Sequence, residues 1–512
     1  MRPSPASGGS PVNDQQFLLN RRRLLKLLGA ASASALLPGC GSSSGLDIPP
    51  PVRGDARRVI IVGAGMAGLT AANALNNAGV ECVVLEARDR IGGRLWTRDI
   101  GGVPIDMGGS WIHDPNGNPM SDFAQRAGVA RRPVDPTNDL LSIYLYEAES
   151  GPALQPEAVL AFAHYQGFEE TAATWLRQLG PGASVKDGIL RYLSVIGPTM
   201  LPEQRRRAEH LTRYVNETFD AAHWEDISLY YHVHSPVDTY GGSEFGDFPV
   251  GGYRRLVKAM ASNSDIRLQH RMTRIAASDD GVTIEAVVTD NGSQTTQTFT
   301  GSHVLVTLPL GVLKRGTVTF EPDLPQRKLA AIQKVGFGHF EKVAMRFDEP
   351  FWESGATPRT HFYFRSDSQL LPMEFPFWLD LQHSMGELAL VGLTSAAFAQ
   401  DFVTRSEAQI RSRVMEIFRA AYGANIPQPT DFAVTSWGTD EFAAGAYSYL
   451  AVGSAPEDMD ALAEPVAGRI LFAGEATYPK RYGYADGALS SGLREVRRLL
   501  QTDAVQITPG PS

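Results

Sequence analysis

The pattern of hydrophobic positions is clearest in residues 58–94, where it predicts a strand, a helix and a second strand. An uninterrupted apolar, β-branched run at Val59–Val62 is typical of a buried parallel strand. The Ala- and Leu-rich segment Leu69–Ala78 predicts a helix that ends at Gly79, and a second apolar run follows at Cys82–Leu85. Because a helix joins two such strands, the segment predicts a βαβ unit.

The rest of the chain shows shorter patterns of the same kinds. Residues around 120–245 are helix-rich and aromatic, and residues 340–450 alternate strand-like runs with one helix. The expected elements, in chain order, are a helix at 253–262, strands at 266–268, 282–288, 303–308, 342–347 and 388–393, a helix at 407–422, a strand at 469–473 and a helix at 489–500.

This order of elements predicts an α/β protein in which a Rossmann-like nucleotide-binding domain is discontinuous and a second, α+β domain is made from insertions. The expected pieces of the nucleotide-binding domain are residues 57–125, 248–320 and 451–502. Between them lie a helical insertion at 126–247 and a substrate-binding domain at 321–450, and residues 503–512 are expected to form a disordered tail.

Glycines punctuate the first strand–helix turn in the dinucleotide-binding pattern. Gly63 permits the tight turn, Gly65 lets the backbone approach a pyrophosphate, and Gly68 lets the helix and strand pack closely. The pyrophosphate would lie at the helix N-terminus, where unpaired N–H groups favour negative charge. Glu86, at the end of the second strand, is expected to accept hydrogen bonds from ribose hydroxyls. The intervening residues assigned to the same cofactor contact are Ala64, Met66 and Ala67.

The residues after the second strand indicate which dinucleotide binds. Gly92, Gly93 and Arg94 suit a second backbone approach to the phosphates with a guanidinium beside them. Ala87 and Arg88 are assigned to the same contact. A GG-containing extension resembles flavin-dependent enzymes more than nicotinamide dehydrogenases.

Composition narrows the function classes. Of 512 residues, 43% are hydrophobic and 20% charged, which is ordinary for a globular protein with a sizeable core. The formal charge of -9 and the lack of a basic patch argue against nucleic-acid binding. The two cysteines, Cys40 and Cys82, cannot form a disulfide framework, and no apolar run reaches the ~20 residues of a membrane span.

The N-terminus predicts a targeting segment at 1–39, followed by a flexible linker at 40–56. Arg21, Arg22 and Arg23 precede two leucines and a short apolar region that ends at Leu37. This pattern resembles a bacterial twin-arginine export signal, which predicts an extracytoplasmic or periplasmic enzyme that is exported with its cofactor already bound. An ordinary signal peptide or an amphipathic N-terminal helix are the alternatives.

The processing of this segment has two readings. Leu37-Pro-Gly-Cys40 resembles a lipobox, which would attach the protein to a membrane through a lipidated Cys40, whereas Ala33-Ser-Ala35 is an A-x-A site for soluble release. Loss of residues 1–39 removes five basic residues and one acid, and so takes the formal charge from -9 to -13. Such an acidic enzyme would attract cationic substrates, although solubility alone also explains the charge.

The chain resembles the flavin-containing amine oxidase family, which includes monoamine oxidases, polyamine oxidases and histone lysine demethylases. The resemblance covers roughly residues 57–502 and implies a two-dinucleotide-binding-domain flavoprotein of the amine oxidase type. The segment at 108–119 looks most like animal spermine and polyamine oxidases, except that Asp114 stands where those usually have glycine. The motifs are LEARDRIGGR (85–94), VLVTLPLGVLKRGTVTFEPDLP (304–325), VGFGHFEKVAMRFDEPFW (335–352) and LFAGEATYPKRYGYADGALSSGLREV (471–496).

The resemblance implies roles for residues around the flavin. Lys342 matches the active-site lysine that holds a water against flavin N5, and Glu475 matches the acid that contacts the ribityl and phosphate region. Met272 falls where the family has a residue giving backbone contacts to adenine. Ser110 and Trp111 match a segment that lies along the flavin.

The resemblance also implies a substrate site. Tyr447 and Tyr484 match two aromatic positions that flank the substrate amine, and His113 matches a substrate-side histidine of polyamine oxidases. Trp437 and Ala485, in the neighbouring loops, are assigned to the cofactor, and Tyr484 is assigned to the cofactor as well as to the amine. The position of the flavin-tethering cysteine of monoamine oxidases is alanine in this sequence, so FAD is expected to bind non-covalently. No metal is expected.

These assignments predict an FAD-dependent oxidase of small amines, with O2 as the second substrate and spermine, spermidine or their acetylated forms as the amine. Hydride transfer to flavin N5 would give an imine, which water hydrolyses to an aldehyde, and O2 would be reduced to H2O2. An L-amino-acid oxidase, a monoamine oxidase and a flavin-binding protein without turnover are the alternatives. The sequence assigns no arginine to a substrate carboxylate and does not decide the oligomeric state.

Overall fold

The computed structural model describes residues 54–133, 145–147, 151–152, 155–242, 246–352, 361–364 and 375–512. All of these residues fall within one compact unit, residues 43–512. The expected targeting segment, Cys40 and most of the expected linker lie outside the described residues.

A five-stranded parallel sheet carries the glycine-rich turn, and its strands come from three separate parts of the chain. Four of the strands are apolar and mostly buried, as expected for a sheet covered on both faces, whereas the edge strand at 265–267 is polar and partly exposed. The expected βαβ unit is confirmed, and its helix α2 (Met66–Asn77) begins one turn earlier than the apolar pattern indicated. In sheet order the strands are β22 (Ile470–Phe472), β13 (His303–Val306), β1 (Arg58–Val62), β2 (Glu81–Leu85) and β9 (Asp265–Arg267).

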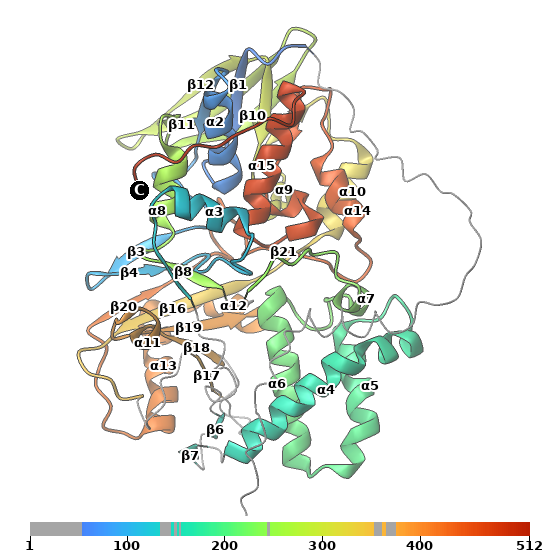
Figure 1. Cartoon of the computed structure of the whole chain (residues 1–512), viewed down its shortest axis with the longest axis vertical. Coiled ribbons are helices and arrows are strands. Elements are labelled where there is room, and N and C mark those ends of the chain that lie inside the picture. The colour runs from blue at the N-terminus through green and yellow to red at the C-terminus, as the bar shows by residue number, and fades with distance from the viewer. Residues whose placement is uncertain are drawn as a thin grey trace, which may run out of the picture. The chain divides into compact units, whose positions relative to one another are not determined.

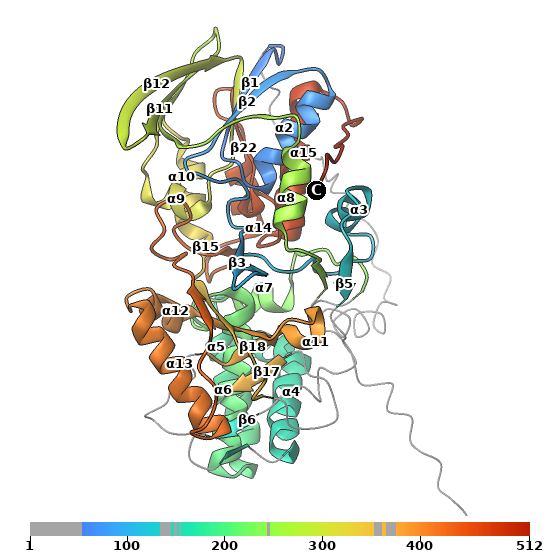
Figure 2. The same ribbon diagram turned by 90° about the vertical axis from the view of Figure 1, so that its left-hand side faces the viewer.

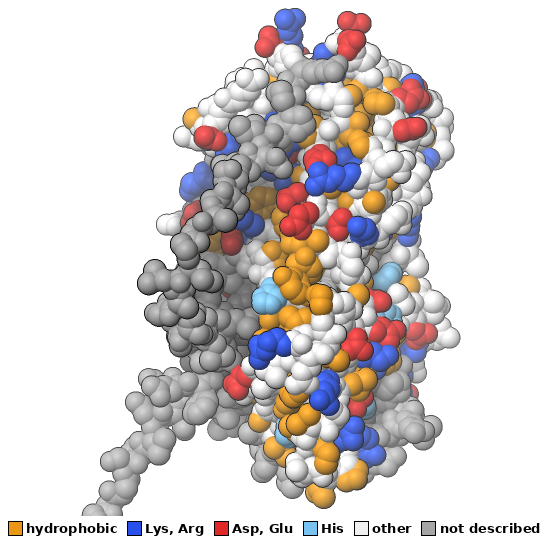
Figure 3. Space-filling model, turned by 90° about the vertical axis from the view of Figure 1, so that its right-hand side faces the viewer, with side chains coloured by type: hydrophobic (Ala, Val, Ile, Leu, Met, Phe, Trp, Pro, Cys, Tyr) orange, Lys and Arg blue, Asp and Glu red, His pale blue; other side chains and the backbone are white. Residues whose placement is uncertain are grey.

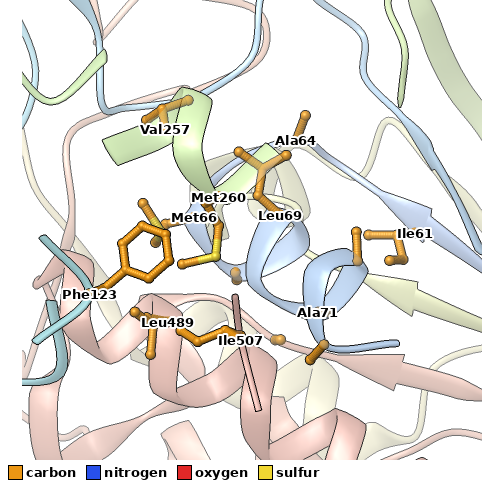
Figure 4. Close-up of a cluster of buried hydrophobic side chains, with 14 of the residues drawn as sticks. Ile61, Ala64, Met66, Leu69, Ala71, Phe123, Val257, Met260, Leu489 and Ile507 are labelled. Atoms are coloured by element: carbon orange, nitrogen blue, oxygen red, sulfur yellow. The ribbon is translucent and has the colours of Figure 1, made fainter. Parts of the chain in front are cut away.

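Helices cover one face of this sheet around α2. Figure 4 shows Leu69 of α2, Phe123, Met260 and Leu489 in one buried cluster, and these side chains come from four different helices. The three partner helices are α3 (Pro119–Arg126), α8 (Arg254–Ala261) and α15 (Ala485–Leu500). The core of the nucleotide-binding half therefore lies directly behind the glycine-rich turn.

The C-terminal tail differs from the expectation of disorder. Ile507 is 7% exposed within the same cluster (Figure 4). The amide side chain of Asn73 in α2 donates to the Thr508 carbonyl and accepts from its N–H, each at 2.8 Å. The short tail offers little apolar pattern, so its order depends on this distant asparagine and could not be predicted from local sequence.

A second, mainly antiparallel sheet covers the other face of the parallel sheet, and only its β10–β14 pair is parallel. Apolar residues of β11, which alternate with polar ones along the strand, form one buried cluster with Ile60 and Val83 of the parallel sheet. The strands, in sheet order, are β12 (Ser293–Gly301), β11 (Val282–Asp290), β10 (His270–Ala277) and β14 (Thr319–Glu321).

A seven-stranded sheet and a helical group form the other half of the described chain (Figures 1 and 2). Figure 1 shows α4 (Gln155–Leu179), α5 (Val185–Ile196) and α6 (Pro202–Asp220) at the end away from the parallel sheet. The strands, in order, are β20 (Asp431–Val434), β16 (Phe340–Arg346), β19 (Ala389–Ser395), β18 (Phe377–Asp380), β17 (His361–Phe364), β6 (Leu145–Glu147) and β7 (Gly151–Pro152).

The helix α13 (Glu407–Tyr422) has the bounds that the sequence predicted and packs against the seven-stranded sheet. The other helices and strands are β3 (Thr97–Ile100), β4 (Val103–Asp106), β5 (Arg131–Pro133), α7 (Leu229–Val233), β8 (Asp247–Pro249), α9 (Leu310–Arg315), α10 (Gln326–Lys334), β15 (Gly336–Phe337), α11 (Leu381–Met385), α12 (Ala396–Phe402), β21 (Ser448–Tyr449) and α14 (Pro456–Ala463).

The surface shows no single dominant charge on the face seen in Figure 3. Lys and Arg side chains lie among Asp and Glu side chains there, with hydrophobic side chains between them. Among the residues that the structure describes, no helix combines the length and apolarity that a membrane span needs.

Candidate active site

The glycine-rich turn has the geometry of a dinucleotide cradle. Gly63 has a φ of 103°, which favours glycine, and a Cβ on Gly68 would lie 2.0 Å from the Gly63 carbonyl oxygen. A Cβ on Gly65 would meet no protein atom within 4 Å. Gly63 and Gly68 are therefore required by the fold, whereas Gly65 faces open space at the N-terminus of α2.

The second glycine pair lies against the first turn. The Gly92 N–H donates to the Ala64 carbonyl at 2.8 Å, and a Cβ on Gly93 would lie 3.4 Å from the Cα of Gly65. Two glycine-rich backbones thus meet at one point, as the sequence predicted. A backbone-lined space at a helix N-terminus fits a pyrophosphate.

Glu86 braces this turn at the end of β2. Its carboxylate is 6% exposed and accepts hydrogen bonds from the backbone N–H groups of Ala64 at 2.7 Å and Arg88 at 2.9 Å. Burial raises the pKa of the Glu86 carboxyl, and these two hydrogen bonds oppose that change. Each carboxylate oxygen retains a second lone pair with which it could accept a bond from a ribose hydroxyl.

The side chain of Arg88, which the sequence assigned to the cofactor, pairs instead with a protein carboxylate. Its guanidinium forms two hydrogen bonds with the carboxylate of Asp440, at 2.6 and 2.8 Å. This pair ties the end of β2 to the loop that follows Trp437. Ala87, which precedes Arg88, is half-buried beside this junction.

Arg94 and Glu475 join the first and last motifs. The Arg94 guanidinium donates to the Glu475 carboxylate at 2.9 Å and to the Ala446 carbonyl at 2.7 Å. The other Glu475 oxygen accepts from the Ser448 hydroxyl at 2.5 Å and the Gly483 N–H at 2.8 Å. Glu475 therefore holds together the segments that carry Tyr447 and Tyr484.

Lys342 lies in the middle of β16 and is 4% exposed. Its Nζ donates to the Asp106 carbonyl at 3.1 Å, the Gly108 carbonyl at 2.6 Å and the Ser110 hydroxyl at 2.5 Å. Burial lowers the pKa of the Lys342 ammonium and raises that of the nearby Asp106 carboxyl, while their mutual attraction opposes both changes. The lysine thus anchors the segment that leads to Trp111.

Trp111 has an indole N–H that needs a partner. Its Nε1 is buried and, among the described residues, has no hydrogen-bond acceptor. The Tyr253 hydroxyl donates to the Trp111 carbonyl at 3.1 Å, and this hydrogen bond fixes the backbone of Trp111. Because a buried unpaired donor is unfavourable, this position fits a ligand with polar acceptors, such as a flavin.

Four aromatic side chains come together beside this segment. The rings of Trp111 and His113 are stacked with centroids 5.8 Å apart, and His113 meets Tyr484 edge to face at 4.9 Å. A Cβ on Gly483 would lie 3.5 Å from the ring of Tyr447, so both expected cage tyrosines lie in one loop cluster. The structure thus unites the predicted substrate residues.

Tyr447 is also fixed against the helical group. Its hydroxyl donates to the carbonyls of Thr218 at 3.0 Å and Phe219 at 3.2 Å, in the last turn of α6. Burial raises the pKa of this hydroxyl well above its usual value. The negative end of the helix dipole therefore lies at the aromatic cluster, where it favours a cationic or proton-rich group.

The remaining cofactor predictions fall in three places. Trp437 donates from its indole N–H to the Met107 carbonyl at 3.1 Å, and Ala485 is the first residue of α15. Met272 lies on β10 and is 4% exposed, next to an irregularity in its pairing with β11. Trp437 thus reaches the segment that Lys342 anchors, whereas Met272 packs in the cluster behind β2.

Sequence reasoning missed the acidic residue beside Lys342. Glu341 is fully buried and accepts from the Thr435 hydroxyl at 2.5 Å and the N–H groups of Trp437 at 3.0 Å and Gly438 at 2.8 Å. Burial raises the pKa of Glu341 to about 7. Its signal was the alternation of β16, which places Glu341 and Lys342 on opposite faces of a buried strand.

Two further acids and an arginine were also missed. Arg481, Asp114 and Asp486 form a buried ion-pair cluster beneath Tyr484. Asp114 was noted only as a departure from the polyamine oxidase pattern. Within the described part of the chain, His, Cys, Asp and Glu side chains form no group of three that could hold a metal ion.

Comparison with known proteins places this geometry in a family. A family model for flavin containing amine oxidoreductases matches residues 66–500. Lysine-specific histone demethylase 1 homolog 2 of Oryza sativa subsp. japonica is 33% identical over 461 residues, which cover 88% of this chain and 58% of that protein. The Arabidopsis thaliana protein of the same name is 33% identical over 470 residues and is covered over 59% of its length. The chain thus spans less than two thirds of these relatives.

Solved structures show the same fold. A putrescine oxidase variant from a structure-based redesign of cofactor binding has a TM-score of 0.68 and 20% sequence identity, with 87% of this chain and 99% of that chain covered. A double mutant from the same redesign has a TM-score of 0.67 and 21% identity. The mixed α/β fold, the cradle and the family match together show that this chain belongs to the flavin-containing amine oxidoreductase family, with FAD as its cofactor.

Proposed function

We propose that this FAD-dependent amine oxidase oxidises a small polyamine, such as spermidine, spermine or their acetylated forms. The observation that carries the proposal is the union of Tyr447, Tyr484 and His113 with the last turn of α6. Aromatic rings and helix C-terminal carbonyls both favour an amine that carries, or shares, positive charge. The putrescine oxidase structures share the fold of this chain at 20% sequence identity.

The protein must also provide a neutral amine for oxidation. A free alkylamine has a pKa near ~10.4, so about one molecule in a thousand is neutral near neutral pH, a free-energy difference of ~4 kcal/mol. A substrate amine enclosed by Tyr447 and Tyr484 would lose part of its hydration, which lowers its pKa. This desolvation opposes the preference of the rings and of the α6 carbonyls for the cation. Both tyrosine side chains are half-buried, which leaves room for a ligand to complete their burial.

Bound FAD supplies the two-electron chemistry, accepting a hydride from the carbon next to nitrogen and returning the electrons to O2 as H2O2. The chain's own residues orient the participants. Trp111 and Ser110 would lie along the flavin, Lys342 fixes that segment, and the tyrosine pair would hold the amine. Hydrolysis of the oxidised amine then consumes one water and yields an aldehyde and a smaller amine.

Peroxide release across a substrate panel tests the proposal. The panel contains spermine, spermidine, their acetylated forms, putrescine, a monoamine, L-amino acids and a methyl-lysine peptide, and anaerobic flavin bleaching is followed in parallel. Polyamines should give the highest kcat/KM. Bleaching by an L-amino acid, with the flavin left oxidised by every polyamine, would replace the polyamine assignment with the amino-acid oxidase alternative.

We also propose export by the twin-arginine route and non-covalent FAD. The support is Arg21–Leu25 for export and Ala446 at the position of a flavin-tethering cysteine. Changing Arg21, Arg22 and Arg23 to Lys should leave the enzyme in the cytoplasm, and unchanged export would exclude this route.

Acid should release all the FAD from purified protein, whereas flavin retained on the precipitate would contradict non-covalent binding. A Cys40→Ala variant should move from the membrane to the soluble fraction if Cys40 is lipidated.

A further inference from the structure

A buried ion cluster lies directly behind the aromatic substrate site. Arg481 is 1% exposed, and its Nε and Nη2 donate to the two carboxylate oxygens of Asp486 at 2.6 and 3.2 Å. Its Nη1 donates to the carboxylate of Asp114 at 2.8 Å and to the carbonyl of Asp238 at 3.0 Å. Both acidic residues are also buried: Asp114 is 2% exposed and Asp486 is 3% exposed.

The cluster touches the proposed cage through its guanidinium. The Arg481 Cζ lies 4.1 Å from the centroid of the Tyr484 ring and 4.9 Å from that of Tyr240. Asp114 follows His113 directly in the chain, and His113 meets Tyr484 edge to face. One side chain therefore connects the two loops that carry these neighbouring rings.

The backbone indicates that the Asp114 carboxylate has a purpose beyond turn formation. Asp114 has a φ of 46°, in the left-handed region that favours glycine. Glycine adopts this conformation without a steric penalty, so glycine would serve the backbone better. The chain instead has a buried carboxylate there, and buried ion pairs are weak contributors to stability that can serve to define a conformation.

We propose that Arg481 is a positioning residue for amine oxidation, which acts with Asp114 and Asp486 to fix Tyr484 relative to His113. The planar guanidinium suits this role because it can bind Asp486 with two hydrogen bonds while it stacks on the tyrosine ring. The inference rests on the proposed role of Tyr484 in holding the amine. Misplacement of a substrate by about 1 Å can slow a reaction by about 10²-fold, so a small change in this cluster should be measurable.

The test compares two variants of the FAD-loaded, full-length enzyme. Asp114→Gly removes the carboxylate at a backbone position that glycine accepts, and Arg481 retains Asp486 and the Asp238 carbonyl as partners. Arg481→Lys retains the charge but loses the planar fork. Anaerobic mixing with spermidine, or with the best amine of the substrate panel, gives the limiting rate of flavin reduction per bound FAD.

Both variants should bind FAD, but the amine should reduce their flavin at least about ten-fold more slowly than in the wild type. The rate at which O2 reoxidises the chemically reduced enzyme should be unchanged. The matched control is Glu495→Gln. Glu495 lies in α15, as Asp486 does, and its buried carboxylate pairs with Arg494 at 2.6 Å and with Arg498 at 3.4 Å. The Tm of this control variant should fall while its reduction rate per FAD stays at the wild-type value.

Two results would overturn the inference, and they differ. If amines reduce the wild-type flavin and either folded variant matches its rate within two-fold, the cluster is only structural and the proposed function stands. If no amine in the panel reduces the wild-type flavin, the proposed function fails and this inference fails with it. A variant that folds poorly is replaced by the other, because either one alone must show the slower reduction.

Discussion

The open space beside Gly65 gives a direct test of where the cofactor binds. Gly65 precedes α2 with a φ of -78° and a ψ of -179°, which any residue can adopt, and a Cβ there would meet no protein atom within 4 Å. Gly65→Ala should therefore fold normally. Alanine is a poorer N-cap than glycine, but it also reduces the entropy of the unfolded chain, and the two effects are of similar size, each about 0.5–1 kcal/mol.

The loss should appear only when FAD binds. A methyl group forced into a closely packed contact costs about 1–3 kcal/mol. If the Gly65 backbone lies against the pyrophosphate, this energy reduces binding, and at 1.4 kcal/mol per factor of ten it raises the Kd for FAD by about 5- to 150-fold. By contrast, Gly68→Ala should prevent folding, because its Cβ would lie 2.0 Å from the Gly63 carbonyl oxygen.

Fluorescence titration of apoprotein with FAD measures this effect, and the Tm of the apoprotein reports the fold separately. Gly182→Ala is the control, since a Cβ on Gly182 also meets nothing within 4 Å and its φ lies outside the left-handed region. Gly182→Ala should bind FAD as the wild type does. Wild-type FAD affinity in Gly65→Ala, within two-fold, would show that the space beside Gly65 does not hold the dinucleotide.

Two buried lysines give further predictions. Lys342→Met fills the same space but cannot donate to the carbonyls that lead to Trp111, so FAD should stay bound while the rate of flavin reduction, of reoxidation or of both falls at least about ten-fold in stopped-flow traces. Burial lowers the pKa of Lys328 to about 7, so between pH 7 and 9 the unfolded chain binds a proton at this lysine that the folded chain has lost. The free energy of unfolding should therefore rise by about 2–3 kcal/mol more in the wild type than in Lys328→Met over that range, and parallel urea-unfolding profiles would contradict this assignment.

The parts of the fold that the sequence predicted best are those with local signals. The βαβ unit depends on two apolar runs and three glycines within thirty residues, and its strands and helix lie where the pattern indicated. Glu86 followed from its place at the end of β2. The same locality explains why α13 was predicted with the correct bounds, since Ser406 forms a capping box with Gln409 and Gly423 follows the last turn.

The buried charges could not be predicted in this way. Glu341 and Lys342 are adjacent and charged, a pattern typical of a solvent-exposed strand, yet they are 0% and 4% exposed. Their burial depends on β19 and β20, which pair with both edges of β16 and come from residues 389–434. The sequence gives the identity of such groups but not the distant partners that make burial possible.

The missed residue Arg481 shows why the substrate side is the harder part to predict. Its partner Asp114 lies 367 positions away in the chain, and Asp114 stands in a loop while Arg481 ends a three-residue 3-10 helix. The cofactor side, by contrast, depends on backbone turns whose glycines stand in one short motif. Side chains of this loop cluster can be substituted without disturbing the glycine-rich cradle. The reason is that Glu475 joins the cofactor side to the substrate side mainly through hydrogen bonds to backbone and to Arg94. Substitutions at His113, Asp114 and Arg481 should therefore change the rate of amine oxidation while FAD affinity remains unchanged, and paired measurements of FAD affinity and flavin reduction on the Gly65 and Asp114 variants can establish this separation.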